Sequence, residues 1–269
     1  MSLPAALTEA LARFAGHRPV LVASDFDGVL APFETDPDQV RPMTGAIDLL
    51  DDLAALEDVH VAIVSGRDLA TLARLTGVTD SDPVTLIASH GAESSSVPVR
   101  EAMEAAGLTP EDKDRLERLT AEVTALVEQH HPQVRVEHKA AAIVVHTRGL
   151  PAEVAAPALA QARAAALAHE GVRVLKGKSV VEMSVSHADK GTALAAYGRH
   201  VGAKARLYLG DDVTDEDVFA RFTGANDVTV KVGDGSTAAR HRIADEQAAL
   251  ELLRTLAAGL RRRPATDER

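Results

Sequence analysis

The chain has 269 residues, a formal net charge of −11 at pH 7, and a composition that is 46% hydrophobic and 26% charged. This length is sufficient for one large globular domain or two smaller ones with a hydrophobic core. The negative charge, the absence of Trp and the presence of only two Tyr and five Phe residues argue against a nucleic-acid partner, which needs basic grooves and stacking side chains. The chain has no Cys, which excludes disulfides, a thiol nucleophile and thiolate metal ligands.

Signals for export or membrane insertion are missing from the sequence. Residues 1–9 lack the basic start and the long apolar stretch of a signal peptide. No apolar run approaches the ~20 residues that cross a bilayer. We therefore expect a cytoplasmic protein without a membrane partner, and a monomer is the default expectation.

The first third of the chain alternates short β-branched runs with longer amphipathic stretches rich in Ala and Leu. This alternation predicts a parallel sheet covered by helices. The expected elements, in chain order, are strand 20–23, helix 43–57, strand 59–64, helix 68–75 and strand 84–88.

The pattern then changes. The next expected elements are helix 111–129, strands 134–138 and 141–147, helix 152–169, and strands 172–175 and 180–185. A helix followed by two adjacent strands, repeated once, is typical of an α+β unit with hairpins. We interpret residues 96–186 as a cap domain inserted into a core domain formed by residues 1–95 and 187–269.

The crossover pattern resumes in the last part of the chain. The expected elements are helix 190–201, strand 205–209, helix 215–222, strand 228–232 and helix 246–260. The predicted fold class is therefore α/β, with a Rossmann-like parallel-sheet core and an inserted α+β cap domain.

Two carboxylates stand at the end of the first strand, in the sequence ASDFDGVL (23–30). Side chains alternate along a strand, so Asp25 and Asp27 begin on the same side of the sheet. Two acids this close repel each other unless a cation lies between them or one keeps its proton. The pair suits a Mg²⁺ site with a nucleophilic carboxylate beside a proton donor, although a strand that runs into an Asp-Gly turn gives the same letters.

Two further polar clusters follow expected strands. Ser65, Gly66 and Arg67 can hold a phosphate with a hydroxyl and backbone N–H groups, and the alternative is a helix cap formed by Ser65 with Asp68. Lys190 opens a later helix, where it either offers a point charge to a phosphoryl group or is a solvated surface side chain.

The fourth cluster, DDVTDED (211–217), places five acids in seven residues directly after a strand. Thr214 is the expected N-cap of the next helix, and acids favour the first helical turn. Capping does not account for Asp211 and Asp212, which precede Thr214. Crowded carboxylates need a cation, and hard oxygen ligands suit Mg²⁺.

All four clusters are expected at one edge of the sheet, where the parallel strands end and where open α/β sheets bind ligands. Together they supply a carboxylate nucleophile, a hydroxyl and an ammonium group for phosphate, and acids for Mg²⁺. These are the parts that phosphoryl transfer needs.

With these four clusters in this order, the chain resembles the haloacid dehalogenase superfamily of phosphatases and, within it, the trehalose-6-phosphate phosphatases. The narrower resemblance rests on the strings SHGAE (89–93), VEHK (136–139), HTR (146–148) and GDDVTDE (210–216), and on Lys178 with Glu182. It covers nearly the whole chain. The chain departs from the family pattern at Val29, where the family usually has Thr.

The resemblance implies a Mg²⁺-dependent phosphatase that hydrolyses trehalose 6-phosphate through an aspartyl-phosphate. By it, Asp25 is the nucleophile, Asp27 the general acid and base, and Ser65 and Lys190 bind the phosphoryl group. The metal site implied is Asp25, the backbone carbonyl of Asp27 and Asp211, assisted by Asp212 or Asp215. The substrate contacts implied are Arg67, His90 and Glu93 in the core, and Lys139, Lys178 and Glu182 in the cap.

Other interpretations remain open at the level of sequence. Lys178 and Glu182 are alternatively a surface ion pair, and His90 a turn residue. The substrate is alternatively sucrose 6-phosphate or a phosphoglycerate conjugate. A receiver-like phospho-signalling module also uses clustered acids, Mg²⁺ and a Lys, but receivers are much shorter and lack a cap. A catalytically inactive scaffold disagrees with the intact set of polar clusters.

Overall fold

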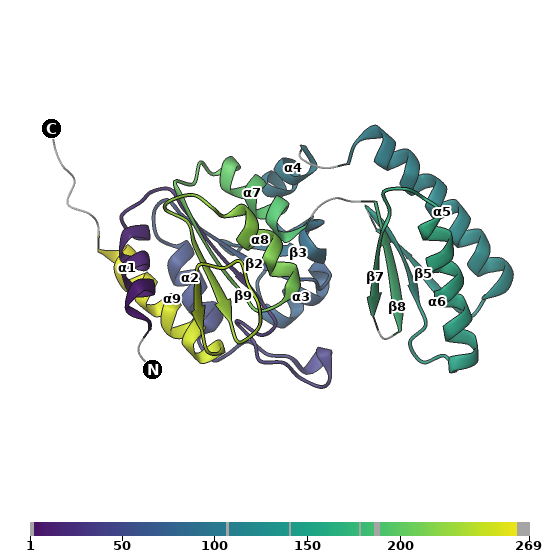
Figure 1. The fold of residues 1–269 in the computed structure, drawn as a ribbon, viewed down its shortest axis with the longest axis horizontal. Coiled ribbons are helices and arrows are strands. Elements are labelled where there is room, and N and C mark those ends of the chain that lie inside the picture. Colours follow the sequence, from purple (N-terminus) through teal and green to yellow (C-terminus); the bar gives the residue numbers. More distant parts are fainter. Residues whose placement is uncertain (1–2, 106–107, 140, 178, 186–188, 263–269) are drawn as a thin grey trace. The chain divides into compact units, whose positions relative to one another are not determined.

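The structure, a computed structural model, describes residues 3–105, 108–139, 141–177, 179–185 and 189–262. The chain separates into two compact units (Figure 1). Unit 1 contains residues 1–106 and 188–269, and unit 2 contains residues 107–187.

Unit 1 is built on a seven-stranded sheet of order β11-β10-β9-β1-β2-β3-β4. All neighbouring strands are parallel except β3 and β4. The strands are β1 (Val20–Asp25), β2 (Val59–Val64), β3 (Val84–Ala88), β4 (Glu93–Ser94), β9 (Ala205–Gly210), β10 (Val228–Val232) and β11 (His241–Ile243). The predicted α/β, Rossmann-like fold class is confirmed.

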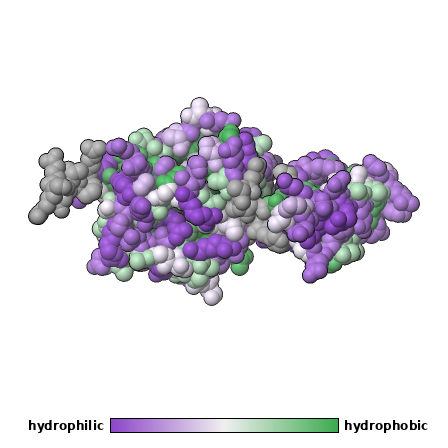
Figure 2. Space-filling view, turned by 90° about the horizontal axis from the view of Figure 1, so that it is seen from above, coloured by the Kyte–Doolittle hydropathy of each residue, from purple (hydrophilic) through white to green (hydrophobic). Residues whose placement is uncertain are grey.

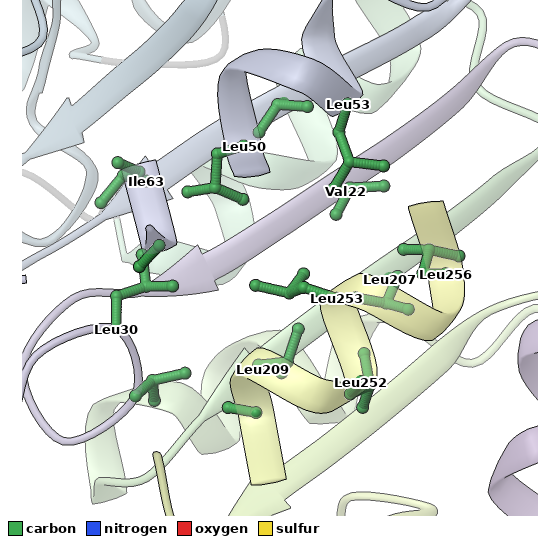
Figure 3. Packing of buried hydrophobic residues seen from close by; sticks show 14 of the residues in the cluster. Val22, Leu30, Leu50, Leu53, Ile63, Leu207, Leu209, Leu252, Leu253 and Leu256 are labelled. Atoms are coloured by element: carbon green, nitrogen blue, oxygen red, sulfur yellow. The ribbon is translucent and has the colours of Figure 1, made fainter. Parts of the chain in front are cut away.

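Helices cover both faces of this sheet, which explains why its central strands are mostly apolar. One face is covered by α1 (Ala5–Phe14), α2 (Ala46–Ala54), α3 (Leu69–Thr76) and α9 (Glu246–Arg261). The other is covered by α4 (Val97–Ala105), α7 (Lys190–His200) and α8 (Glu216–Arg221). Figure 3 shows the first face, where leucines of α2 and α9 pack against Val22, Leu207 and Leu209 of the sheet.

The described part of unit 1 also contains three short 3₁₀ turns: η1 (Pro37–Gln39), η2 (Ser89–Gly91) and η3 (Val213–Asp215). Turn η2 directly follows β3, and η3 follows β9 after two intervening residues. They therefore lie at the edge of the sheet where the parallel strands end.

Unit 2 is a four-stranded antiparallel sheet of order β5-β6-β8-β7 with two helices on one face. Its elements are α5 (Pro110–His130), β5 (Arg135–His138), β6 (Ala142–His146), α6 (Ala152–Leu167), β7 (Arg173–Gly177) and β8 (Val180–Ser184). Helix α5 begins with a capping box formed by Thr109 and Asp112, with Pro110 at its first position. The element order is the one expected from the sequence.

Two helices were not expected. Helix α1 buries Leu7, Leu11 and Phe14 in the core. Helix α4 places Val99, which is 2% exposed, in the apolar cluster shared with α7 and α8. Because α4 packs on unit 1, the division between the units falls after Ala106, whereas the sequence suggested a boundary near residue 95.

Among the residues that the structure describes, apolar side chains are concentrated in three buried clusters, two in unit 1 and one in unit 2. Hydrophilic residues cover most of the face that Figure 2 shows. Among the described helices, none has both the length and the apolar composition that a bilayer crossing requires.

Two leucines of unit 2 provide a test of this packing. Leu119 on α5 is fully buried in the unit 2 core, whereas Leu167 at the end of α6 is 62% exposed. We expect Leu119→Ala to lower the free energy of unfolding by about 2–5 kcal/mol, because it removes buried apolar surface and leaves a cavity.

The matched change Leu167→Ala should lower the free energy of unfolding by less than about 0.5 kcal/mol. Urea unfolding followed by far-UV circular dichroism measures both. Equal losses for the two variants would contradict the packing described for α5.

Candidate active site

A pocket of about 350 Å³ lies at the carboxyl ends of the parallel strands of unit 1. It is lined by Asp25, Asp27, Phe33, Pro37, Ser65, Gly66, Arg67, His90, Lys190, Asp211, Asp212 and Thr214. The pocket thus brings together residues from all four polar clusters. The parallel arrangement of β1, β2 and β9 explains this for three of the clusters, because their carboxyl ends meet at one edge. The expectation that Lys190 follows a parallel strand is wrong, because the strand before it, β8, belongs to the antiparallel sheet of unit 2, and Lys190 reaches the pocket from the first turn of α7.

Lys190 lies on the floor of the pocket. Asp189 caps α7 and forms a capping box with Thr192, which fixes Lys190 at the first position of the helix. The side chain is 3% exposed, and its Nζ donates to Asp25 Oδ1 and to Asp215 Oδ1, each at 2.8 Å. Lys190 is therefore an internal ion-pair partner, and its interpretation as a solvated surface lysine is wrong.

The charges of this cluster depend on one another. Burial alone lowers the pKa of Lys190, but Asp25 and Asp215 outweigh it and raise that pKa, so the ammonium stays charged. Burial raises the pKa of Asp25 and Lys190 opposes the rise, while Asp215 and Asp211 add to it. An ionised Asp25 therefore depends on nearby positive charge.

Asp27 is held by Arg67 through both carboxylate oxygens. Arg67 Nε donates to Oδ2 at 2.8 Å and Nη2 donates to Oδ1 at 2.7 Å. The third guanidinium nitrogen donates to the backbone carbonyl of Pro37 at 2.9 Å. The hydrogen bond to Asp27 raises the pKa of Arg67. Arg67 thus fixes the orientation of Asp27 and attaches the loop at Pro37 to the same site.

Ser65 is 1% exposed and its Oγ accepts from the backbone N–H of Arg67 at 3.1 Å. The N-cap of α3 is Asp68, whose carboxylate accepts from the N–H of Thr71 at 2.8 Å. The alternative interpretation of Ser65 as a capping residue paired with Asp68 is therefore wrong. Ser65 lines the pocket instead.

His90 enters the pocket from the turn η2. Ser89 and His90 have φ values of 50° and 54°, a region that costs energy for residues other than glycine. Their backbone N–H groups donate to the carbonyls of Arg67 at 2.7 Å and Ser65 at 3.0 Å, which holds the two loops together. Glu93 accepts from the Ser89 hydroxyl. His90 is therefore both a turn residue and a pocket residue.

The acidic cluster has two kinds of member. Asp212 caps η3 by accepting from the N–H of Val213 at 2.7 Å. The N-cap position of α8 is Asp215, so the expectation that Thr214 caps this helix is wrong. Asp215 is 0% exposed and its oxygens accept from the side chains of Lys190 and Tyr208 and from the backbone N–H groups of Asp211 and Asp212. Part of the acidity of this segment therefore serves its own backbone.

A divalent cation fits among the carboxylates at this edge of the sheet. Oxygens of Asp25, Asp211 and Asp215 lie within 4.8 Å of one another. Asp211 Oδ1 is buried and has no hydrogen-bond partner among the described residues. Burial, with Asp215 adding, raises the pKa of Asp211 to about 6. Mg²⁺ prefers hard oxygen ligands such as these carboxylates, and Asp211 Oδ1 is available to bind it.

Gly28 allows the two acidic segments to approach. Its φ is +77°, and a Cβ at this position would lie 2.7 Å from the Phe33 ring and closer still to the Asp211 carboxylate. Only glycine fits there. The neighbouring Val29, which replaces the usual Thr, is 1% exposed in the hydrophobic core, so an apolar side chain suits its position.

Two of the candidate residues of unit 2 form an ion pair with each other. Lys139 Nζ donates to Glu182 Oε2 at 2.9 Å, and Glu182 lies on β8. Lys178, the other expected partner of Glu182, lies outside the described residues. The ion pair described for Glu182 is therefore with Lys139.

Sequence reasoning missed Tyr208 and Phe33. Tyr208 lies inside the mostly apolar strand β9, where the sequence pattern predicts only a core residue. Its hydroxyl nevertheless donates to Asp215 Oδ1 at 2.6 Å. Burial and Asp215 raise its pKa, so it keeps its proton. Phe33 is 68% exposed at the pocket, in a loop without a periodic pattern.

Comparisons with known sequences identify relatives. The sequence pattern described as trehalose-phosphatase matches residues 23–251. A trehalose-phosphate phosphatase of Mycolicibacterium paratuberculosis is 34% identical over 272 residues, covering 96% of this chain and 66% of the relative. A bifunctional trehalose-6-phosphate synthase/phosphatase of Thermoproteus tenax is 32% identical over 246 residues, covering 90% of this chain and 32% of the relative. The chain thus spans less than the full length of both.

Solved structures share the fold. A trehalose-6-phosphate phosphatase of Aspergillus fumigatus superposes with a TM-score of 0.62 at 23% identity, covering 94% of this chain and 97% of that one. The C-terminal domain of a trehalose-6-phosphate phosphatase of C. albicans superposes with a TM-score of 0.62 at 25% identity, covering 96% of this chain and 98% of that one.

The raised pKa of Asp211 predicts a pH-dependent stability. In metal-free protein the folded state holds this proton up to about pH 6, whereas the unfolded chain releases it near pH 4. The folded state is therefore progressively destabilised as the pH rises from about 4 to 6. Asp211→Asn removes this penalty, so in EDTA at pH 8 the variant should be more stable than the parent chain by about 1 kcal/mol, allowing for solvent screening.

Thermal melting at pH 5 and pH 8 measures this difference, which should shrink at pH 5. Asp80→Asn, at an exposed loop position, is the control and should change little. Mg²⁺ should stabilise the parent chain and not Asp211→Asn. A variant that is less stable than the parent in EDTA at pH 8 would contradict the account of Asp211.

Proposed function

The chain belongs to the trehalose-phosphatase family, and from this premise we propose that it hydrolyses trehalose 6-phosphate to trehalose and inorganic phosphate. The observation that carries the proposal is the buried Lys190 ammonium, 2.8 Å from Asp25 Oδ1, in a pocket that also contains Asp27, Ser65 and Asp211. These groups supply a nucleophile, a proton donor and positive charge for a phosphoryl group.

In the first step Asp25 attacks phosphorus. Lys190 donates to Oδ1, and we assign the attack to the other oxygen, Oδ2. The bond from Oδ2 to phosphorus forms while the bond from phosphorus to the sugar oxygen breaks, and Asp27 gives its proton to that oxygen. Arg67 holds both oxygens of Asp27, so at least one of these hydrogen bonds gives way when Asp27 carries the proton.

In the second step water hydrolyses the aspartyl-phosphate. Asp27, now a carboxylate, takes a proton from the water, whose oxygen attacks phosphorus as the bond to Asp25 breaks. Ser65 and Lys190 bind the phosphoryl oxygens in both steps. The proton that Asp27 takes from the water is the one that it gives to the leaving group in the next turnover.

Asp25, Asp211 and the backbone carbonyl of Asp27 would hold a Mg²⁺ ion, with Asp212 and Asp215 supporting them. When bound, the ion would neutralise the repulsion between the nucleophile and the phosphoryl oxygens. The unpartnered Asp211 Oδ1 supports this assignment.

Unit 2 is proposed as the domain that selects the sugar. Ile143, Val145 and Met183 face the helices of this unit, so the alternating positions, which include Glu182, lie on the other face of the sheet. Lys139, Lys178 and Glu182 would contact sugar hydroxyls, and His90 and Glu93 would do so from unit 1. Paired charges of this kind suit a polyhydroxylated ligand.

Phosphate release from a panel of sugar phosphates with Mg²⁺ tests the proposal. We expect trehalose 6-phosphate to exceed sucrose 6-phosphate and glucose 6-phosphate in kcat/KM by at least about 100-fold, because unmatched polar groups are costly in a site built for hydroxyls. Equal rates on all sugar phosphates would contradict the substrate assignment. Stable phosphorylation without turnover would instead indicate a signalling module.

Asp27→Asn tests the proton donor. General acid catalysis contributes roughly 10²–10⁴-fold, and its loss matters most when the leaving group is a poor one. We expect a loss of this size in kcat/KM with trehalose 6-phosphate and a much smaller loss in kcat/KM with p-nitrophenyl phosphate, whose leaving group needs no proton. Steady-state kinetics on both substrates measure kcat/KM, which reports the steps up to departure of the leaving group and excludes the later hydrolysis that both substrates share. Equal losses of kcat/KM on both would refute the role of Asp27 as the proton donor.

A further inference from the structure

A buried tyrosine lies directly beneath the proposed site. Tyr208 on β9 is 0% exposed, and its hydroxyl donates to Asp215 Oδ1 at 2.6 Å. The ring packs in the apolar cluster with Phe219 of α8. A buried tyrosine usually satisfies its hydroxyl somewhere, so the contact alone is compatible with a purely structural role. The contact is informative because the partner of the Tyr208 hydroxyl is Asp215, which also contacts Lys190.

Asp215 is a carboxylate whose acceptor positions are filled. Oδ1 accepts from Tyr208 at 2.6 Å and Lys190 at 2.8 Å. Oδ2 accepts from the backbone N–H groups of Asp211 at 2.8 Å and Asp212 at 2.9 Å. An ionised carboxylate offers about four such positions. Asp215 therefore holds two parts of the site at once: the ammonium of Lys190 and the backbone that carries Asp211.

The tyrosine hydroxyl affects how Lys190 is shared. The ammonium lies 2.8 Å from Asp25 Oδ1 and 2.8 Å from Asp215 Oδ1. A donated hydrogen bond from Tyr208 draws part of the negative charge of Asp215 Oδ1 to itself. Without it, Asp215 attracts Lys190 more strongly, and the ammonium moves away from Asp25 and from the phosphoryl oxygens. Such outer partners tune catalytic groups that they do not replace.

We propose that Tyr208 is a positioning residue of the phosphoryl site, acting through Asp215 on Lys190 and on the loop that carries Asp211. The proposal rests on the proposed phosphatase function only for its kinetic readout. Nothing in it depends on the identity of the sugar.

The second tyrosine of the chain provides a matched control. Tyr197 on α7 belongs to the same apolar cluster, is 5% exposed, and its hydroxyl contacts Thr85 Oγ1 at 3.1 Å. Tyr208→Phe and Tyr197→Phe therefore each remove one hydroxyl with one hydrogen bond from the same apolar cluster of unit 1. Only the first contacts the phosphoryl site.

In the kinetic experiment, Tyr208→Phe should lower kcat about tenfold on both trehalose 6-phosphate and p-nitrophenyl phosphate, with KM within twofold, since one hydrogen bond to a charged group is lost. Tyr197→Phe should keep kcat within twofold. In an Asp215→Asn background, Tyr208→Phe should add less than a twofold loss, because its effect passes through Asp215. Thermal melting of each variant reports its folding.

Binding of orthovanadate with Mg²⁺, measured by isothermal titration calorimetry, tests the proposal without turnover. Tyr208→Phe should bind it about tenfold more weakly, and Tyr197→Phe should not. The proposal is overturned if Tyr208→Phe stays within twofold of the parent in both readouts, or if Tyr197→Phe loses as much. If the parent chain does not hydrolyse trehalose 6-phosphate, the proposed function fails, and the vanadate comparison alone decides the role of Tyr208.

Discussion

The site depends on one buried ammonium between two buried carboxylates. Lys190 lies 2.8 Å from Asp25 and 2.8 Å from Asp215, and the three side chains are 3%, 7% and 0% exposed. Charges this deep are tolerated only when they are paired and hydrogen-bonded. One cation shared by two anions leaves a net negative charge, to which Asp211 adds. The cluster therefore attracts a further cation, and the same positive charges then suit a phosphoryl group.

The fold assembles this cluster from distant segments with simple local rules. Parallel strands deliver Asp25 from β1 and Asp211 after β9 to one edge of the sheet. A capping box at Asp189 fixes the start of α7, so Lys190 is the first residue of the helix and lies at the pocket. Arg67 then orients Asp27 and fastens the loop at Pro37. Most of these contacts join residues that are far apart in the sequence, although the helices and strands that carry them are determined by neighbouring residues.

The sequence predicted the residues that face the pocket better than their partners. Strand alternation and strand ends identified Asp25, Asp27 and Asp211, because these signals are local. The ion pairs of Arg67 with Asp27 and of Lys190 with Asp25 join residues 40 and 165 positions apart, and no short-range pattern encodes them. Tyr208 was missed because a tyrosine in an apolar strand has the same pattern whether or not its hydroxyl has a partner.

Chemical trapping of the phosphorylated residue tests the central claim most directly. Protein mixed with trehalose 6-phosphate and Mg²⁺ is quenched in acid within the first turnover, reduced with borohydride, and mapped by peptide mass spectrometry. The account predicts that reduction marks Asp25 alone, and that the mark falls sharply in Lys190→Ala. Modification of another residue, or full turnover with an unmarked Asp25, would contradict it.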